Sequence, residues 1–183
     1  MLYTKIIYKS LIQQADSLKT LAKSIDEVAY DEVLKILLTC KGKVIISGVG
    51  KSGHIGRKIA ATLASTGTSS FFVHSTEALH GDLGMIEKND VVIFISNSGE
   101  TNEVIGVIPS LQKRGNKLLA IQLQFNGKNS VSKLSMYTDM FIAKPSDPKI
   151  FPDFNVCSKF FCHELHPGEF FSNEKTPIFI CGA

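Results

Sequence analysis

The sequence predicts an α/β fold, a three-layer α/β/α sandwich built on a five-stranded parallel sheet. Short apolar runs alternate with longer segments of helical periodicity, which is typical of βαβ units. Residues 91–95 are apolar without interruption, as in strands that are covered on both faces. Glycine follows three of the helical patterns, at Gly42, Gly67 and Gly115, where a helix would end.

Helical patterns open the chain. Apolar residues fall near one face from about Ile6 onward, and Ser24 followed by Glu27 resembles a capping box that would open a second helix over residues 28–38. We expect this helical segment to cover one face of the sheet or a partner subunit.

Strands and helices then alternate as far as residue 144. Strands are expected at 43–47, 70–74, 90–96, 117–122 and 140–144, and helices at about 55–65, 102–114 and 130–134, with a loop or short helix over 75–84. We therefore expect one domain over 1–144, with helices in 1–40 and a sheet core in 41–144. Residues 145–183 are rich in proline and phenylalanine, so their fold is left open apart from a strand at 178–181.

The composition is that of a soluble globular chain. The 183 residues are 44% hydrophobic and carry a net charge of +3 with scattered basic residues, so no nucleic acid partner is expected. No apolar stretch reaches the ~20 residues that span a membrane, and the N-terminus lacks a signal peptide's features. We therefore expect a cytoplasmic protein without membrane contact. Four cysteines are too few and too uneven for a disulfide framework.

Two polar loops follow predicted strands and lead into helices. The first runs from Gly48 to Gly53 with Lys51 and Ser52, and the second is residues 96–101, with three hydroxyl side chains and a glycine. Backbone N–H groups at a helix N-terminus, hydroxyls and a lysine suit a phosphate group. Because ligands of open parallel sheets bind at the carboxyl ends of strands, we predict one phosphate site shared by both loops. N-capping remains an alternative explanation for the second loop.

Two nucleotide-binding motifs are excluded. A P-loop would need glycine at the position of Ile45, inside the first strand. The dinucleotide pattern G-x-G-x-x-G does match at 48–53, but no acidic residue ends the second strand and Lys51 would crowd a pyrophosphate. A dinucleotide is therefore the less favoured ligand for this loop.

Three motifs resemble a known family. They are Gly-Val-Gly-Lys-Ser-Gly-His-Ile-Gly-Arg-Lys at 48–58, Ser-Thr-Glu-Ala-Leu-His-Gly-Asp-Leu-Gly at 75–84 and Ser-Asn-Ser-Gly-Glu-Thr at 96–101. They are similar to the SIS (sugar isomerase) domain, a flavodoxin-like or Rossmann-like fold, and more narrowly to its bacterial D-arabinose-5-phosphate isomerase branch. We expect no paired CBS domains of the kind that longer members carry.

The resemblance implies an isomerase that interconverts D-ribulose 5-phosphate and D-arabinose 5-phosphate, a step toward the lipopolysaccharide sugar KDO. It implies no cofactor, a pentose 5-phosphate as substrate and a homotetramer. Carried onto this sequence, it implies phosphate binding by Gly50, Ser52, Ser96, Ser98 and Thr101, and catalysis by Lys51, His80, Glu103 and His166.

An aldose–ketose isomerisation moves a proton between two carbons through an enediolate, so it needs a base, an oxyanion stabiliser and a proton shuttle. Glu103 is a candidate base, Lys51 could supply positive charge to the oxyanion, and the His80 imidazole suits proton transfer near neutral pH. The simpler alternatives stay open: a first-turn carboxylate, a phosphate counter-charge and a turn histidine. Glu100 is expected to cap its helix rather than to react.

After Lys144 the chain departs from the family. A glutamate-bearing loop expected after the fifth strand is missing, and residues 166–168 resemble a family segment with a functional histidine only over His-Pro-Gly. The alternative function is therefore a non-catalytic sugar-phosphate-binding domain or a degenerate remnant of the isomerase. Cys157, Cys162 and His163 near His166 lack a standard zinc spacing, so no metal site is predicted.

Overall fold

The computed structural model describes residues 2–23, 25–122, 132–137 and 140–143. Its centre is a parallel sheet in the order β2-β1-β3-β4-β5, in which every neighbouring pair of strands is parallel. The strands are β1 (Val44–Gly48), β2 (Ser70–His74), β3 (Val91–Ser96), β4 (Lys117–Gln122) and β5 (Met140–Ala143).

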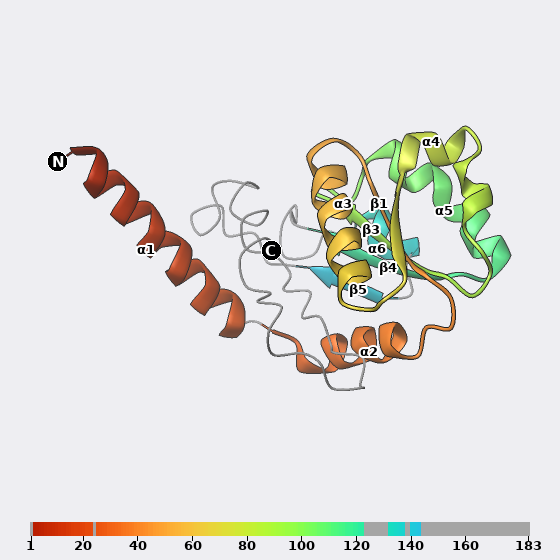
Figure 1. Cartoon of the computed structure of the whole chain (residues 1–183), viewed down its shortest axis with the longest axis horizontal. Coiled ribbons are helices and arrows are strands. Elements are labelled where there is room, and N and C mark those ends of the chain that lie inside the picture. The colour runs from red at the N-terminus through yellow and green to blue at the C-terminus, as the bar shows by residue number, and fades with distance from the viewer. Residues whose placement is uncertain (1, 24, 123–131, 138–139, 144–183) are drawn as a thin grey trace.

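The sheet lies between two helical layers (Figure 1). Even-numbered residues of β1 pack with α2 (Glu27–Leu38) and α3 (Gly50–Ser65), whereas Ile45 packs on the other face with α4 (Ser75–Leu79), α5 (Asn102–Arg114) and α6 (Lys133–Tyr137). Successive strand residues point to opposite faces, so a run such as β3 is buried throughout. The three-layer, parallel α/β class predicted from the sequence is confirmed.

Glycine lets α3 lie close to the sheet. A Cβ on Gly56 would come within 2.9 Å of the Phe72 ring, and one on Gly53 within 3.2 Å of the Gly48 carbonyl oxygen. Gly53 and Gly56 therefore serve packing, whatever ligand the first polar segment binds. They bring the N-terminus of α3 against the end of β1.

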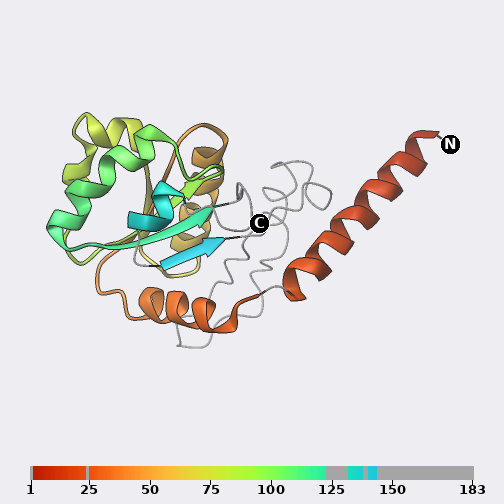
Figure 2. The same ribbon diagram turned by 180° about the vertical axis from the view of Figure 1, so that it is seen from behind.

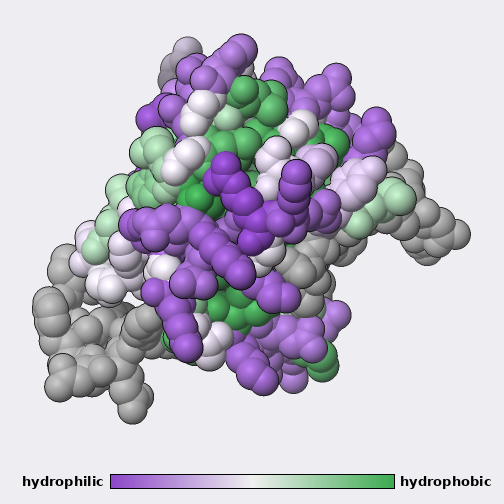
Figure 3. Space-filling view, turned by 90° about the vertical axis from the view of Figure 1, so that its right-hand side faces the viewer, coloured by the Kyte–Doolittle hydropathy of each residue, from purple (hydrophilic) through white to green (hydrophobic). Residues whose placement is uncertain are grey.

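Helix α1 (Leu2–Lys23) projects away from the body of the molecule (Figures 1 and 2). Its apolar side chains are largely exposed, including Tyr3, Ile7 and Leu11. By contrast, the face of the body turned away from α1 is largely hydrophilic, with apolar residues gathered in smaller areas (Figure 3). The N-terminal helical segment was expected to cover either the sheet or a partner subunit. Of its two helices, α2 covers the sheet and α1 does not.

Most predicted elements are confirmed within one residue, and β2, α5 and β4 have the predicted bounds. Three predictions at helix starts were wrong. Helix α3 begins at Gly50, earlier than the apolar periodicity indicated, so Lys51 lies in its first turn. Helix α2 is capped by Asp26 rather than Ser24, because the Asp26 carboxylate accepts from Ala29 N at 3.1 Å. Helix α6 begins at Lys133, later than predicted.

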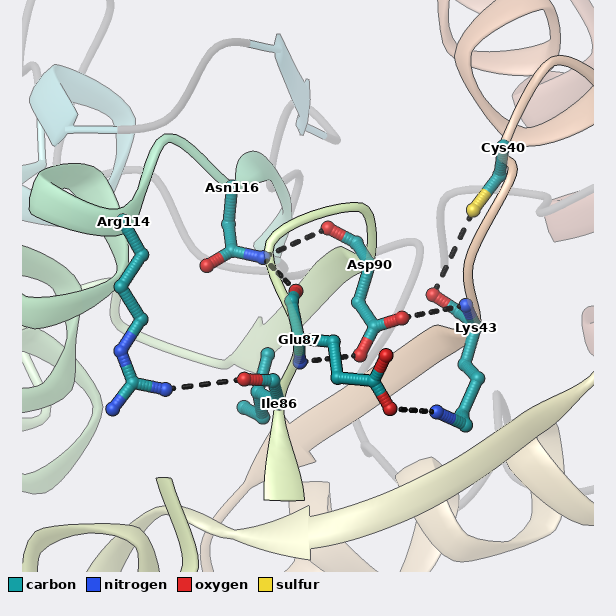
Figure 4. A network of polar contacts seen from close by, with 7 residues as sticks. All are labelled: Cys40, Lys43, Ile86, Glu87, Asp90, Arg114 and Asn116. Carbon is teal, nitrogen blue, oxygen red and sulfur yellow. Dashed lines mark hydrogen bonds and ion pairs between the residues drawn. The ribbon is translucent and has the colours of Figure 1, made fainter. Parts of the chain in front are cut away.

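A polar network closes the amino edge of the sheet (Figure 4). The buried Asp90 carboxylate accepts from Lys43 N at 2.7 Å and from Glu87 N at 2.8 Å. Asn116 Nδ2 donates to the carbonyl oxygens of Glu87 and Asp90 at 2.7 and 3.1 Å. These bonds tie the starts of β1, β3 and β4 together at the edge opposite the polar loops.

Several predictions concern residues outside the described part of the chain. They are His166, the strand at 178–181, the cysteines and histidines considered for a metal, and all structure after Ala143. Among the helices that the structure describes, none is both long and apolar enough to cross a bilayer.

Candidate active site

Three loops leave the same edge of the sheet, because parallel strands end on the same side. They follow β1, β2 and β3, which are direct neighbours in the order β2-β1-β3. Gly48 at the end of β1 lies opposite Ile95 in β3, and a Cβ on Gly48 would approach the Ile95 carbonyl oxygen to 2.9 Å. The segments that carry Ser52 and Ser98 therefore start side by side.

The first segment is the N-terminus of α3. Its first helical hydrogen bond runs from Gly53 N to Val49 O at 3.2 Å, so the preceding N–H groups point out of the helix end, where they can bind an anion. Gly50 has a φ of 56°, which glycine adopts readily. Ser52 is buried in the first turn, whereas Lys51 is exposed beside it.

The second segment, residues 96–101, is held by its own hydroxyls. Gly99 N donates to Ser96 Oγ at 3.0 Å, Glu100 N donates to Ser98 Oγ at 3.2 Å, and Ser96 Oγ lies 3.1 Å from Thr101 Oγ1. Thr101 occupies the N-cap position of α5, but its side chain makes no capping hydrogen bond. Simple N-capping therefore does not account for the hydroxyl at Thr101.

The segment that follows β2 begins with α4. The His74 side chain caps this helix, because its Nδ1 accepts from the Thr76 N–H at 3.3 Å. Ser47 Oγ and Ser75 Oγ lie 2.9 Å apart, both buried, and join the end of β1 to the start of α4. The sequence placed Ser75 in the loop after the second strand but did not single out Ser47, because a hydroxyl inside a strand carries no signal until its partner is known.

Two predicted catalytic side chains lie on neighbouring elements. His80 is the exposed C-cap residue of α4, and Glu103 is exposed in the first turn of α5. The two helices pack together where the Leu79 side chain comes 3.5 Å from the position of a Cβ on Gly106, one turn after Glu103. The structure therefore brings His80 and Glu103 to one region. His166 lies outside the described residues.

Glu100 has a structural role that the sequence did not reveal. Its carboxylate accepts from Lys133 N at 2.7 Å and pairs with Lys133 Nζ at 3.2 Å. The backbone N–H of Lys133 holds the pKa of the Glu100 carboxyl below its ordinary value, and the Lys133 ammonium adds to this effect. The expectation that Glu100 caps its own helix was wrong, because it anchors the loop to the start of α6.

Comparison with known proteins places this arrangement in a family. The SIS domain model matches residues 37–158, which include all three loops. The chain belongs to the SIS domain family. The similarity read from the three sequence motifs is thereby confirmed.

Two named relatives indicate which branch of the SIS domain family this chain resembles. The chain is 51% identical over 127 residues to the arabinose 5-phosphate isomerase KpsF of Escherichia coli O6:H1, covering 69% of this chain and 38% of that protein. It is 64% identical over 86 residues to the arabinose 5-phosphate isomerase GutQ of Escherichia coli K12, covering 47% of this chain and 27% of that protein. The chain thus spans less than half the length of these curated relatives.

One solved structure has a similar fold. The structure of c3406 from E. coli CFT073 in complex with arabinose 5-phosphate superposes with a TM-score of 0.69 at 41% identity, covering 87% of this chain and 85% of that one. Because the match extends over most of both chains, the SIS domain fold described here is shared beyond the three motifs.

Proposed function

We propose that this chain is an aldose–ketose isomerase that interconverts D-ribulose 5-phosphate and D-arabinose 5-phosphate, as a step toward the lipopolysaccharide sugar KDO. The observation that carries the proposal is that the two segments with the predicted phosphate-binding residues Ser52 and Ser98 start side by side at the carboxyl ends of the strands. The helices that carry His80 and Glu103 lie at the same ends of the strands and pack together. The names of the relatives support the same substrate.

In the proposed reaction, the phosphate is bound by the N-terminus of α3 and by Ser96, Ser98 and Thr101. The base, for which Glu103 is our candidate, removes the C2 proton of the aldose. The electron pair of that C–H bond forms the C1–C2 double bond of an enediolate, while the π pair of the C1 carbonyl moves onto O1. O1 gains a proton, O2 loses its proton and forms the new carbonyl at C2, and the double-bond pair takes up a proton at C1 to give the ketose. C1 is reduced and C2 is oxidised within the same sugar, so no redox cofactor is needed.

The other two side chains would act on the oxygens. Lys51, exposed at the end of α3, would stabilise the negative charge that develops on the enediolate. His80 would carry the proton between O1 and O2 of the sugar, since an imidazole can donate and accept near neutral pH. His166 would add a further catalytic group from the C-terminal segment.

We also propose that the enzyme acts as a homo-oligomer, a tetramer by resemblance, and in the cytoplasm, where charged sugar phosphates are retained. The exposed stripe on α1 supports an oligomer: Tyr3 is 80%, Ile7 61% and Leu11 59% exposed, at a spacing that places them on one helix face. Residues 1–144 would form the SIS unit of each subunit.

The test is to incubate the purified 183-residue chain with D-ribulose 5-phosphate and to follow D-arabinose 5-phosphate by NMR. We expect conversion in both directions to one equilibrium ratio. Binding of either pentose phosphate without conversion would favour the non-catalytic alternative, which the departure from the family after Lys144 keeps open. Absence of both binding and conversion would contradict the proposal.

A further inference from the structure

Gln122, which sequence reasoning passed over, lies directly beside the second polar segment. It is the last residue of β4, is 2% exposed and pairs in register with Ser96, the last residue of β3. Its Nε2 donates to the Ser98 carbonyl oxygen at 3.0 Å, and its Oε1 accepts from Ser132 Oγ. The amide therefore bridges the segment to the residue just before α6.

Helix α6 holds the next peptide group of the same segment. Leu134 N donates to the Gly99 carbonyl oxygen at 3.0 Å. Two consecutive carbonyl oxygens, those of Ser98 and Gly99, are thus directed toward β4 and α6.

The direction of these carbonyls fixes the direction of the N–H groups. In a planar trans peptide, the C=O of one residue and the N–H of the next point in opposite directions. The N–H groups of Gly99 and Glu100 must therefore point away from β4 and α6, and there they donate to Ser96 Oγ and Ser98 Oγ. Successive N–H groups that point the same way form an anion-binding concavity.

Gly99 shows how tightly the segment rests on the amide. Its φ of 69° lies in the left-handed region, and a Cβ there would come within 2.6 Å of Ser132 Oγ and still closer to Gln122 Oε1. The backbone at Gly99 thus packs directly against the Gln122 side chain, so a change in that side chain would be transmitted to the peptide.

We infer that Gln122 is a positioning residue for phosphate recognition, an inference that rests on the proposed function. By holding the Ser98 carbonyl away from the ligand, it keeps the Gly99 N–H directed toward the phosphate. Without that hold, the peptide could turn and present its carbonyl oxygen, which would repel the phosphate. An amide suits the task because it supplies a donor and an acceptor and does not titrate.

The test uses three variants of the full chain. Gln122→Glu replaces the donor to Ser98 by an oxygen, and Ser132→Ala leaves Gln122 in place but removes the donor to its Oε1. Gln112→Glu is the matched control, because Gln112 Nε2 also donates to a backbone carbonyl, that of Tyr137 at 2.9 Å, but does so on the surface.

We expect the KM for D-arabinose 5-phosphate to rise roughly tenfold in Gln122→Glu and about threefold in Ser132→Ala, with kcat within about twofold of wild type. The control should keep both constants. Circular dichroism melting would establish that each variant is folded. A purely structural role for Gln122 would lower the melting temperature without this selective rise in KM.

A folded Gln122→Glu with the wild-type KM, or with a loss confined to kcat, would overturn the inference. If Gln122→Glu does not fold, Ser132→Ala decides by the same criterion. A wild-type chain that binds no D-arabinose 5-phosphate would overturn the proposed function together with the inference. A wild type that binds it while both variants bind equally well would overturn the inference alone.

Discussion

Hydroxyl groups in the segment at 96–101 accept hydrogen bonds from the loop's own N–H groups, at Gly99 and Glu100. A phosphate monoester is a stronger acceptor than a hydroxyl because its oxygens are charged. On binding, it would take over these N–H groups, and the hydroxyls of Ser96 and Ser98 could rotate from accepting to donating. These contacts within the segment thus keep both N–H donors satisfied.

A first prediction concerns Glu103. Glu103→Gln should lower kcat by roughly 10²- to 10⁴-fold, the usual contribution of a general base, with little change in KM. Steady-state kinetics with D-arabinose 5-phosphate would measure this. Glu27→Gln is the control for a helix-dipole effect, because Glu27 is also a first-turn carboxylate, in α2. Full turnover by Glu103→Gln would remove Glu103 from the mechanism.

A second prediction concerns the anchor at Glu100. Because the folded-state pKa is lowered, its stabilising contribution is present above the ordinary pKa of 4.5 and is lost as pH falls through the lowered value. Between neutral pH and pH below 4.5, the melting temperature of wild type should therefore fall more than that of Glu100→Gln. Glu32→Gln, on the exposed side of α2, should behave as wild type. Parallel curves for wild type and Glu100→Gln would contradict this assignment.

At single positions, the sequence showed which hydroxyls follow strand ends but not what holds them. Ser98 and Thr101 stand out because they lie between an apolar run and a helical pattern. Gln122 and Ser132 are far from them in sequence, and each is an ordinary polar residue until the fold places it beside Gly99. Only a long-range contact gives such residues their role.

Among the elements, boundaries set by glycine or by a long apolar run were predicted well, as in α5, which ends at Gly115 with a φ of 81°. The start of α3 was predicted too late because the periodic pattern of apolar residues begins only at Ile55, the first residue of α3 in the apolar core. In the first turn, Gly50 and Lys51 are helical but exposed, so they add nothing to an apolar pattern. Apolar periodicity therefore does not show the start of a helix whose first turn is polar.

The network at the amino edge yields a third prediction. Asp90→Asn would replace one carboxylate oxygen by an NH₂ group that faces a backbone N–H, at a cost of about 1.5–3 kcal/mol. We expect the melting temperature to fall by roughly 5 °C, while KM at a temperature where the chain stays folded is unchanged. Asp31→Asn, exposed on α2, is the control. A melting temperature equal to wild type would show that these bonds contribute no net stability.

For the molecule as a whole, the sequence predicted parallel strands in three layers but not their order. The alternation of elements is local information, whereas the order β2-β1-β3-β4-β5 depends on which strand each crossover reaches. The placement of α1 was also left open between the sheet and a partner. The structure shows it apart from the sheet (Figure 2), so its apolar stripe remains uncovered within the described part of one chain.

A fourth prediction follows from that stripe. The double variant Ile7→Asp, Leu11→Asp should dissociate the proposed oligomer, because burying two carboxylates in an apolar contact is strongly unfavourable. Light scattering after size-exclusion chromatography would measure the mass. The control is the double variant Lys5→Asp, Lys9→Asp on the same helix, which makes a larger charge change but at polar positions. If the wild-type chain is already a monomer, or the Ile7/Leu11 variant keeps the wild-type mass, the interface proposal is wrong.

The most direct test of the central claim, that two neighbouring segments bind one sugar phosphate, is a crystal structure of the chain with D-arabinose 5-phosphate. The account predicts phosphate oxygens about 3 Å from the Ser52 and Ser98 side chains and from the Gly99 N–H, with the sugar carbons toward His80 and Glu103. A phosphate bound away from both segments, or at the opposite edge of the sheet beside Asp90, would contradict it.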